Sequence, residues 1–236
     1  MEKKNYCVFC DDKYLIDNAD KIKNVNIKLL LDDESKDIVH IEYKCNICSS
    51  RIRKRNWFIL YHSILKKLID TSKVMIFSPC PLEKKLFSLP NTKFVTLCGE
   101  YGKDVIYDVD MQNLSKFEKN SFTFVQAINI LDYIPNLKLA LQQVNNILKN
   151  NGYFCFYIEM GRITRDKNKK YSFKKYNIPK HACWSETDVE CVSHINLHVS
   201  YLRKIGNEIF SNVKIYEIKD MYSDKSCPSL FFLFQK

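Results

Sequence analysis

The stretch that decides the fold runs from Ser121 to Glu159 and reads SFTFVQAINILDYIPN, LKLALQQVNNILKN, NGYFCFYIE. Residues 124–128 form an apolar run of strand length, typical of a strand buried on both faces of a parallel sheet. A helix with one apolar face is predicted next, because apolar residues recur at helical spacing. These residues are Leu137, Leu141, Val144 and Leu148.

The sequence also predicts where this helix ends. Asn150, Asn151 and Gly152 form a stop signal, because Asn and Gly tolerate the left-handed conformation that closes a helix. Residues 153–158 then predict a second buried strand. Strand, helix and strand within forty residues make a βαβ unit, so we expect a parallel α/β sheet.

This unit resembles the fourth strand, helix and fifth strand of the class I S-adenosylmethionine-dependent methyltransferases. Their usual pattern is S-F-D-x-V, then L-E-H-I-P-D, then L-K-P-G-G. This chain carries S-F-T-F-V from Ser121, L-D-Y-I-P-N from Leu131 and L-K-N-N-G from Leu148, with departures at Thr123, Tyr133 and Asn150–Asn151. The resemblance implies a Rossmann-like class I methyltransferase sheet and S-adenosylmethionine as the cofactor.

Length and composition agree with a globular enzyme. The 236 residues are 46% hydrophobic and 13% aromatic, enough for one α/β domain with a small appendage. The sequence offers neither an apolar run long enough to span a membrane nor a signal peptide after Met1, so we expect a cytoplasmic protein. In that setting the ten cysteines are expected to be reduced thiols or metal ligands.

Two C-x-x-C pairs supply a complete set of zinc ligands. Cys7 and Cys10 form one pair, Cys45 and Cys48 the other, and 34 residues separate them. Four thiolates leave no open coordination position, which favours a structural Zn²⁺ over a catalytic one. The alternative is two unrelated pairs of ordinary cysteines. We therefore predict a Cys₄ zinc ribbon over residues 1–50.

The residues after the second pair add to the resemblance. The segment C-N-I-C-S-S-R-I-R-K-R from Cys45 resembles a methyltransferase subgroup with a zinc ribbon directly before the domain. Arg53 and Arg55 stand at its arginine positions, either near the cofactor or as a basic helix start. We expect a linking helix over 51–72, with Ile52, Leu60, Ile64 and Leu68 on its apolar face, and the Rossmann-like methyltransferase domain over 73–236.

The cofactor site is expected where the first strands of that domain end. The superfamily usually has a Gly-rich turn after its first strand, whose backbone amides approach the methionine part of the cofactor. Here the resemblance places residues 77–80 at that turn, Cys98 or Glu100 at the ribose acid, and Asp108 with Val109 at the adenine. The implied cofactor-binding residues are Phe77, Ser78, Pro79, Cys98, Gly99, Glu100, Asp108, Val109, Ala127 and Asn129.

Three positions that are acidic in the family differ here. They are Cys80, Cys98 and Thr123. Their replacement leaves open a second reading, in which a degenerate methyltransferase-like domain binds a partner without catalysis.

The positive charge is concentrated in one segment. Residues 162–180 hold eight Lys or Arg and one acid, most of the chain's formal net charge of +10, with Tyr171, Phe173 and Tyr176 between them. We expect a basic lid over 162–193, with a solvated loop as the alternative. Such a lid suits an anionic small molecule such as a sugar nucleotide, or RNA through phosphate neutralisation and stacking.

Histidines near this segment are the candidate bases. His194 falls near a histidine of the zinc-ribbon subgroup, and a neutral imidazole can accept a hydroxyl proton. His181 and Tyr133 are further catalytic candidates, and the spacing of nearby Cys and His residues does not indicate a second metal. A helix from Ile195 to Ile209, with Gly206 as a weak point, and strands over 213–218 and 230–234 complete the expected sheet.

The function expected from the sequence is therefore S-adenosylmethionine-dependent O-methylation of a small polar acceptor, such as a nucleotide-linked sugar or glycan precursor. RNA methylation and non-catalytic binding are the alternatives.

Overall fold

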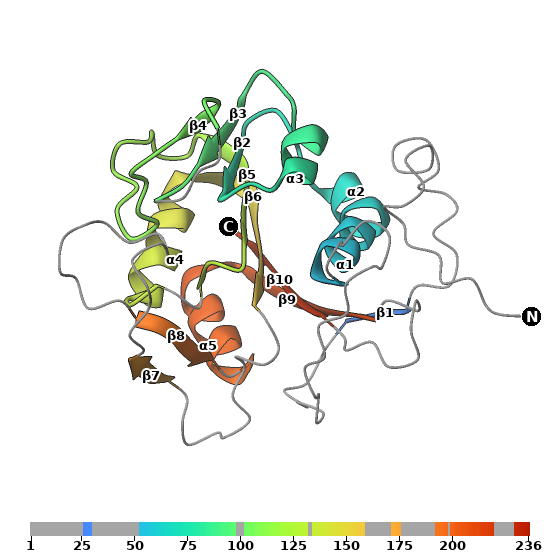
Figure 1. The fold of residues 1–236 in the computed structure, drawn as a ribbon. Helices are drawn as coiled ribbons and strands as arrows, with labels where there is room; N and C mark the ends of the chain where they lie inside the picture. Colours follow the sequence, from blue (N-terminus) through green and yellow to red (C-terminus); the bar gives the residue numbers. More distant parts are fainter. Residues whose placement is uncertain are drawn as a thin grey trace, which may run out of the picture. The chain divides into compact units, whose positions relative to one another are not determined.

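The structure, a computed structural model, describes residues 26–29, 52–97, 102–131, 134–158, 171–175, 192–197, 199–219 and 229–236. The chain divides into two compact units, residues 1–68 with 215–231 and residues 69–214 with 232–236. Figure 1 shows the elements of both. In chain order they are β1 (Asn26–Leu29), α1 (Ile52–Leu60), η2 (Tyr61–Leu65), α2 (Lys66–Leu68), β2 (Val74–Phe77), α3 (Pro81–Leu86), β3 (Thr92–Val95), β4 (Val105–Ile106), β5 (Phe122–Ile128), α4 (Leu137–Ile147), β6 (Leu148–Ile158), β7 (Tyr171–Lys175), β8 (Val192–Leu197), α5 (Val199–Ile209), β9 (Asn212–Lys219) and β10 (Ser229–Gln235).

The second unit is built on a doubly wound sheet. Its strand order from one edge is β4-β3-β2-β5-β6-β10. The first five strands are parallel. The chain starts in the middle at β2, builds outward to β4, and then returns to the other side of β2 with β5. Strand β5, helix α4 and strand β6 confirm the βαβ unit, and the strand order confirms the Rossmann-like expectation.

The last strand makes the sheet mixed. Asn151 N donates to Lys236 O at 3.2 Å and Lys236 N donates to Gly152 O at 3.0 Å, so β10 ends where β6 begins and runs opposite to it. Ser211 N donates to Gln235 O at 2.9 Å, which places the start of β9 beside the end of β10. The expected terminal hairpin is confirmed.

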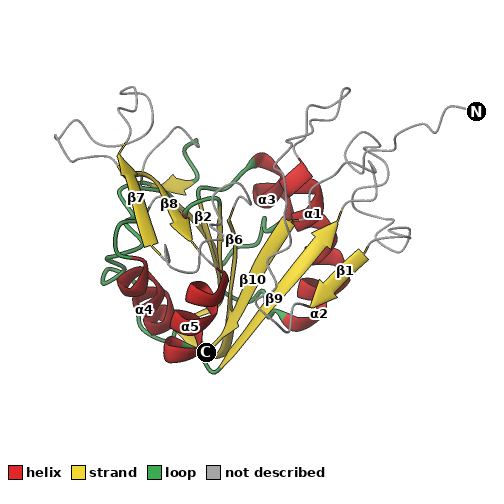
Figure 2. Ribbon diagram, turned by 90° about the horizontal axis from the view of Figure 1, so that it is seen from below, coloured by secondary structure: helices red, strands yellow, loops and turns green. Residues whose placement is uncertain are grey.

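Helices cover both faces of this sheet. On one face, Phe87 at the end of α3 stacks on Phe124 of β5 with ring centroids 5.9 Å apart. On the other face, the Phe156 ring meets Phe234 edge to face at 4.9 Å, and Phe234 packs under Gly206 of α5. Figure 2 shows α4 beside α5, and the two helices are in contact. Aromatic rings therefore pack on both faces of the sheet, beneath its helices.

Two glycines are required by close contacts. A Cβ on Gly206 would lie 2.8 Å from Phe234 Cζ and 2.9 Å from Val213 Cγ2. Gly206 is thus a point of tight helix–sheet packing and not the weak point expected from helix propensity. A Cβ on Gly152 would lie 2.8 Å from Lys149 O, so this residue permits the irregular backbone in the first residues of β6. Asn151 takes the left-handed conformation there, with φ of 61°.

Helix boundaries differ in two places from the sequence expectation. Leu148 is buried as expected but begins β6, and Ile147 takes the last position on the buried face of α4. Ile195 lies in β8, because α5 begins only at Val199. Strand β8 pairs with β7 in a separate antiparallel hairpin. Ile195 happens to stand at the helical spacing of the apolar residues in α5, although it belongs to the strand before that helix. Periodicity alone therefore placed the start of α5 too early.

The first unit contains a helix with a register shift. Leu60 and Leu65 are both fully buried although they are five residues apart, because residues 61–65 form a π-helical turn. The next buried residue is Ile69, and Leu68 is 40% exposed. The expected apolar face through Ile64 and Leu68 is therefore wrong, since a π turn shifts the buried face by one residue.

The first unit also holds an unexpected strand pair. β1, within the predicted zinc-ribbon region, pairs antiparallel with β9, with Ile27 opposite Ile218. Buried Asn56 of α1 donates from Nδ2 to Ile218 O at 3.2 Å and to Ser229 Oγ at 2.7 Å. Sequence separations of more than 160 residues hide these contacts from local patterns.

Some expectations fall outside the described residues. They concern the four zinc ligands Cys7, Cys10, Cys45 and Cys48, and most of the basic lid. The side chains of Arg53 and Arg55 are not described either. None of the described helices is long and apolar enough to cross a membrane.

Candidate functional site

The strand order marks the place for a ligand. β3 and β5 lie on opposite sides of β2, and the chain leaves β2 toward one side and later returns on the other. In open α/β sheets, such a reversal opens a crevice outside the carboxyl ends of the strands, where ligands bind. The residues after β2, β3, β4 and β5 therefore make up the candidate site.

Residues with positive φ lie at both ends of these strands. Ser78 after β2, Asp108 after β4 and Asn129 after β5 have φ values of 47°, 58° and 61°, and Asn120 before β5 and Asn151 near the start of β6 have 53° and 61°. Residues other than glycine seldom adopt this left-handed conformation, and Ser does so less readily than Asn or Asp. Ser78 is therefore the strained residue at the carboxyl edge, and backbone strain of this kind is found at functional sites.

The turn after β2 is held by hydrogen bonds to β3. Ser78 N donates to Val95 O at 2.7 Å. Its hydroxyl lies 3.1 Å from Oγ1 of Thr96, which is 1% exposed. The sequence resemblance pointed to Ser78, but it gave no signal for Thr96, whose role follows only from the pairing of β2 with β3.

The rest of that turn is fixed by a buried carboxylate. Cys80 N donates to Glu83 Oε2 at 2.7 Å, and Gln126 Nε2 donates to Glu83 Oε1. Glu83 is 4% exposed. Burial raises the pKa of the neighbouring Cys155 thiol, and the charge of Glu83 raises it further. Glu83 therefore holds the turn from beneath and does not stand in the crevice as a replacement for the missing acid.

The end of β4 presents an exposed acid beside a buried valine. Asp108 is exposed, while Val109 is 1% exposed and donates its N–H to Thr96 O at 3.0 Å. Lys116 Nζ donates to Asp108 O at 3.2 Å. The backbone around Asp108 is therefore tied on both sides while its carboxylate faces solvent, which suits a ligand that offers hydrogen-bond donors.

Ala127 and Asn129 lie across the crevice. Ala127 is fully buried in β5, and Asn129 N donates to Tyr157 O at 3.1 Å. Thr123 is different, because its hydroxyl donates to Lys73 O at 2.9 Å at the amino ends of β5 and β2. About 20 Å of strand separate Thr123 from Asn129 at ~3.3 Å per residue. Its departure from the family acid therefore has no direct bearing on cofactor contacts.

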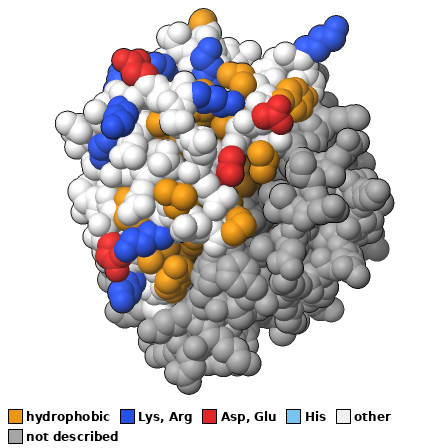
Figure 3. All heavy atoms as spheres, turned by 90° about the vertical axis from the view of Figure 1, so that its left-hand side faces the viewer, with side chains coloured by type: hydrophobic (Ala, Val, Ile, Leu, Met, Phe, Trp, Pro, Cys, Tyr) orange, Lys and Arg blue, Asp and Glu red, His pale blue; other side chains and the backbone are white. Residues whose placement is uncertain are grey.

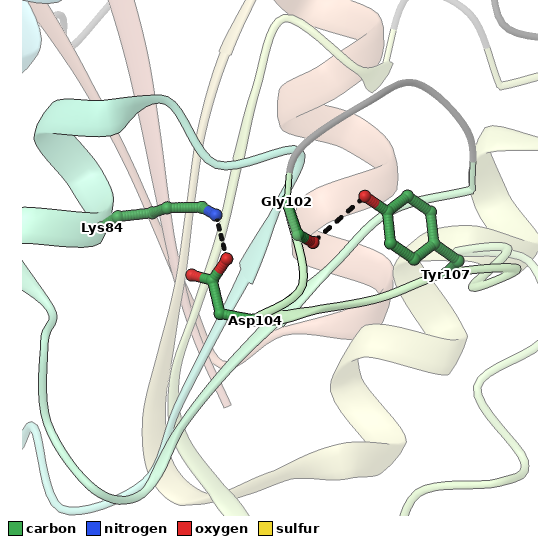
Figure 4. Close-up of polar contacts among 4 residues, drawn as sticks. All are labelled: Lys84, Gly102, Asp104 and Tyr107. Carbon is green, nitrogen blue, oxygen red and sulfur yellow. Dashed lines mark hydrogen bonds and ion pairs between the residues drawn. The ribbon is translucent and has the colours of Figure 1, made fainter.

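The loop between β3 and β4 is anchored by two contacts, drawn in Figure 4. Lys84 Nζ pairs with Asp104 Oδ1 at 2.5 Å, and Tyr107 Oη donates to Gly102 O at 3.2 Å. The hydrogen bond from Lys84 lowers the pKa of Asp104. This loop contains Cys98, Gly99 and Glu100, which lie outside the described residues. The anchoring residues were missed from the sequence, because they are up to twenty positions apart and carry no motif.

The predicted catalytic residues are not tested by these contacts. The backbone of His194 lies in β8 opposite Lys174 of β7, and its side chain is not described. Tyr133 and His181 lie outside the described residues. Within the described part of the chain, no cluster of His, Cys, Asp or Glu could hold a metal ion. The catalytic and zinc assignments therefore remain predictions.

A hollow of about 450 Å³ lies away from the strand ends, between α4 and α5. Its wall includes Lys138 and Glu208, joined at 2.7 Å, and this ion pair raises the pKa of Lys138. Figure 3 shows one face of the molecule, where charged side chains of both signs are interspersed with hydrophobic ones. The hollow involves none of the predicted site residues, so it is not the candidate site.

The strand ends fit the nucleoside half of S-adenosylmethionine. Hydroxyls of Ser78 and Thr96 and the carboxylate of Asp108 offer polar partners. Exposed apolar surface from the end of β3 and from β4 can cover a purine ring. It comes from Leu97, Ile106 and Tyr107, which are 37%, 38% and 40% exposed.

Comparison with known proteins points the same way. Residues 90–156 match the family model described as a methyltransferase domain. That segment includes β3, β4, β5, α4 and most of β6, and with them Thr96, Asp108, Val109, Ala127 and Asn129. The fold is a Rossmann-like α/β fold with a mixed sheet.

Individual relatives are distant. A sterol 4-C-methyltransferase of Caenorhabditis elegans is 31% identical over 93 residues, which are 39% of this chain and 27% of that protein. A putative S-adenosylmethionine-dependent methyltransferase from Listeria monocytogenes has 15% identity and a TM-score of 0.47, over 75% of this chain and 97% of its own. A methyltransferase from Mesorhizobium loti has 11% identity, the same TM-score and the same coverage. At these values the structural likeness says nothing about substrate.

Proposed function

We propose that this protein is an S-adenosylmethionine-dependent methyltransferase. The observation that carries the proposal is the coincidence of three features at one sheet edge. The strand order reverses there, the strained residue Ser78 lies there, and the methyltransferase-domain match contains the ends of β3, β4 and β5. Ser78, Asp108, Val109, Ala127 and Asn129 line the proposed cofactor site.

The bound cofactor supplies an activated methyl group on a sulfonium sulfur. The chain's own residues hold the nucleoside and orient the acceptor for an in-line transfer, a reaction that depends heavily on positioning. His194 is the proposed base for an acceptor hydroxyl, with His181 and Tyr133 as further candidates. A Cys₄ zinc site formed by Cys7, Cys10, Cys45 and Cys48 remains part of the proposal as a structural element.

The acceptor we favour is a small polar metabolite methylated on oxygen, such as a nucleotide-linked sugar. Its support is the basic segment 162–180, which suits a diphosphate. The same charge also suits RNA, the second candidate. The name of the C. elegans relative refers to sterol carbon methylation, but only 27% of that protein is matched.

Calorimetric titration with S-adenosylmethionine and S-adenosylhomocysteine tests the cofactor assignment. We expect dissociation constants in the micromolar range, which is about −8 kcal/mol. Failure of both ligands to bind at millimolar concentration would remove the enzyme assignment and favour a non-catalytic binding domain. A labelled-methyl assay with sugar nucleotides, RNA and sterols then separates the acceptor classes.

A further inference from the structure

The turn between β2 and α3, residues 78–81, has no backbone N–H group available to a ligand. Pro79 and Pro81 have no backbone N–H. The N–H of Ser78 donates to Val95 O, and the N–H of Cys80 donates to the carboxylate of Glu83. Each backbone position of this turn is therefore either without a donor or already donating within the protein.

Those internal bonds are not easily given up. Glu83 is 4% exposed, and its other oxygen accepts from Gln126, whose side chain is fully buried. Breaking the Cys80–Glu83 bond for a ligand would leave a buried carboxylate with one fewer donor, which is costly. Releasing Ser78 N would remove the bond that ties the turn to β3.

The family match agrees with a departure at this point. It begins at residue 90, so it includes the ends of β3, β4 and β5 but not the turn after β2. The nucleoside side of the crevice and the turn side are thus different in kind. One lies within the family match and has the exposed Asp108 at the end of β4, and the other has two prolines and N–H groups that already donate within the protein.

We propose that this site recognises its cofactor through the adenosine half, and that the turn 78–81 donates no backbone N–H to the carboxylate of the amino-acid half. The ligand class is an adenine nucleoside thioether or sulfonium, with the carboxylate of the amino-acid part adding little affinity. This inference rests on the proposed cofactor site and states which part of the ligand that site reads.

The test compares two ligands that differ only in the carboxylate of the amino-acid part. S-adenosylhomocysteine has it, and its decarboxylated analogue has a hydrogen atom in its place. Each hydrogen bond to a charged ligand group changes affinity by on the order of tenfold or more. We expect calorimetry on the full chain to give dissociation constants within about threefold of each other, since no such bond comes from the turn.

Two variants test whether the protein recognises the nucleoside part of both ligands. Asp108→Asn keeps a residue that tolerates the left-handed conformation but removes the carboxylate charge. It should weaken both ligands by the same factor. Glu118→Gln removes an exposed charge near Lys73, at the amino end of the sheet, and should leave both unchanged.

The outcomes separate this inference from the proposed function. S-adenosylhomocysteine binding about thirtyfold or more tighter than its decarboxylated analogue, the effect of roughly two hydrogen bonds, would overturn the inference and leave the cofactor assignment intact. An effect of Asp108→Asn on only one ligand would also contradict it. If neither ligand binds, the proposed function fails and the inference fails with it.

Discussion

Gly206 shows how one missing side chain sets the spacing between a helix and a sheet. A Cβ there would lie within 3.0 Å of two carbon atoms of the Phe234 ring and of a Val213 methyl. We expect Gly206→Ala to destabilise the protein by about 1–3 kcal/mol, because the overpacking outweighs the gain in helix propensity.

The neighbouring exposed residue provides the control for this prediction. Asn207→Ala, in the same helix, should be neutral or slightly stabilising. Denaturant unfolding of both variants measures the difference. Equal stability of the two variants would mean that α5 moves away from the sheet at little cost.

His62 predicts a pH dependence of stability. Its pKa is lowered, first by burial of the imidazole and then by the charge of Lys66. The unfolded chain therefore takes up this proton more readily than the folded one. The contribution of His62 is complete above the ordinary pKa of 6.5 and is lost as pH falls below it.

The variant His62→Phe isolates this contribution. We expect wild type to lose more unfolding free energy than the variant between about pH 7.5 and about pH 5.5. Urea unfolding of both proteins at each pH gives the two slopes. Parallel losses would show that protonation of His62 is not coupled to folding.

At the scale of elements, the loop between β3 and β4 should depend on its anchors. Lys84→Met removes the ion-pair partner of Asp104, which lies in this loop two residues after Gly102. Because this loop carries Gly99 and Glu100, we expect severalfold weaker binding of S-adenosylhomocysteine with little change in unfolding temperature. The pair is exposed, so its effect on stability is small.

Lys85→Met is the matched change for this experiment. Lys85 is the next residue of α3 and is exposed, so its loss should leave affinity unchanged. Calorimetry at two salt concentrations distinguishes the anchor from general charge. Identical affinity losses in both variants would indicate an effect of overall charge and not of the loop.

The predictable elements are those whose information is local. Residues 121–158 carry a strand, a helix and a second strand in consecutive patterns, and these three were confirmed with shifts of a few residues. The predicted left-handed helix stop was wrong, because α4 ends at Ile147 with an extended C-cap at Leu148. The register shift at η2 was not predictable, because no residue in 61–65 marks a π turn. The same holds for Thr96, the Lys84–Asp104 pair and the β1–β9 pairing, which depend on contacts between distant positions.

The candidate site was therefore predictable in part. Ser78, Asp108 and Asn129 followed from a family resemblance, and the structure adds that all three have positive φ. The sequence did not reveal that the backbone N–H groups of the turn after β2 already donate within the protein. That finding requires the position of the Glu83 carboxylate. The prolines were visible, but the consumed N–H groups of Ser78 and Cys80 were not.

For the whole molecule, the zinc prediction is the most direct to check. Purified protein should contain about one zinc ion per chain, as a Cys₄ site requires. Cys45→Ser should lose the metal and lower the unfolding temperature, because binding of a structural metal contributes to folding. Elemental analysis with thermal unfolding measures both. Folded wild-type protein without zinc would contradict the prediction.

The position of β10 has a consequence for how the protein is made. Of the elements described, it is the last to leave the ribosome, yet it lies against β6 and supplies Phe232 and Phe234 to the rings packed on Phe156. Until then, the nascent chain displays the open edge of β6 and an incomplete aromatic core, both of which invite aggregation. Folding of this sheet is thus completed only after synthesis of residues 229–236.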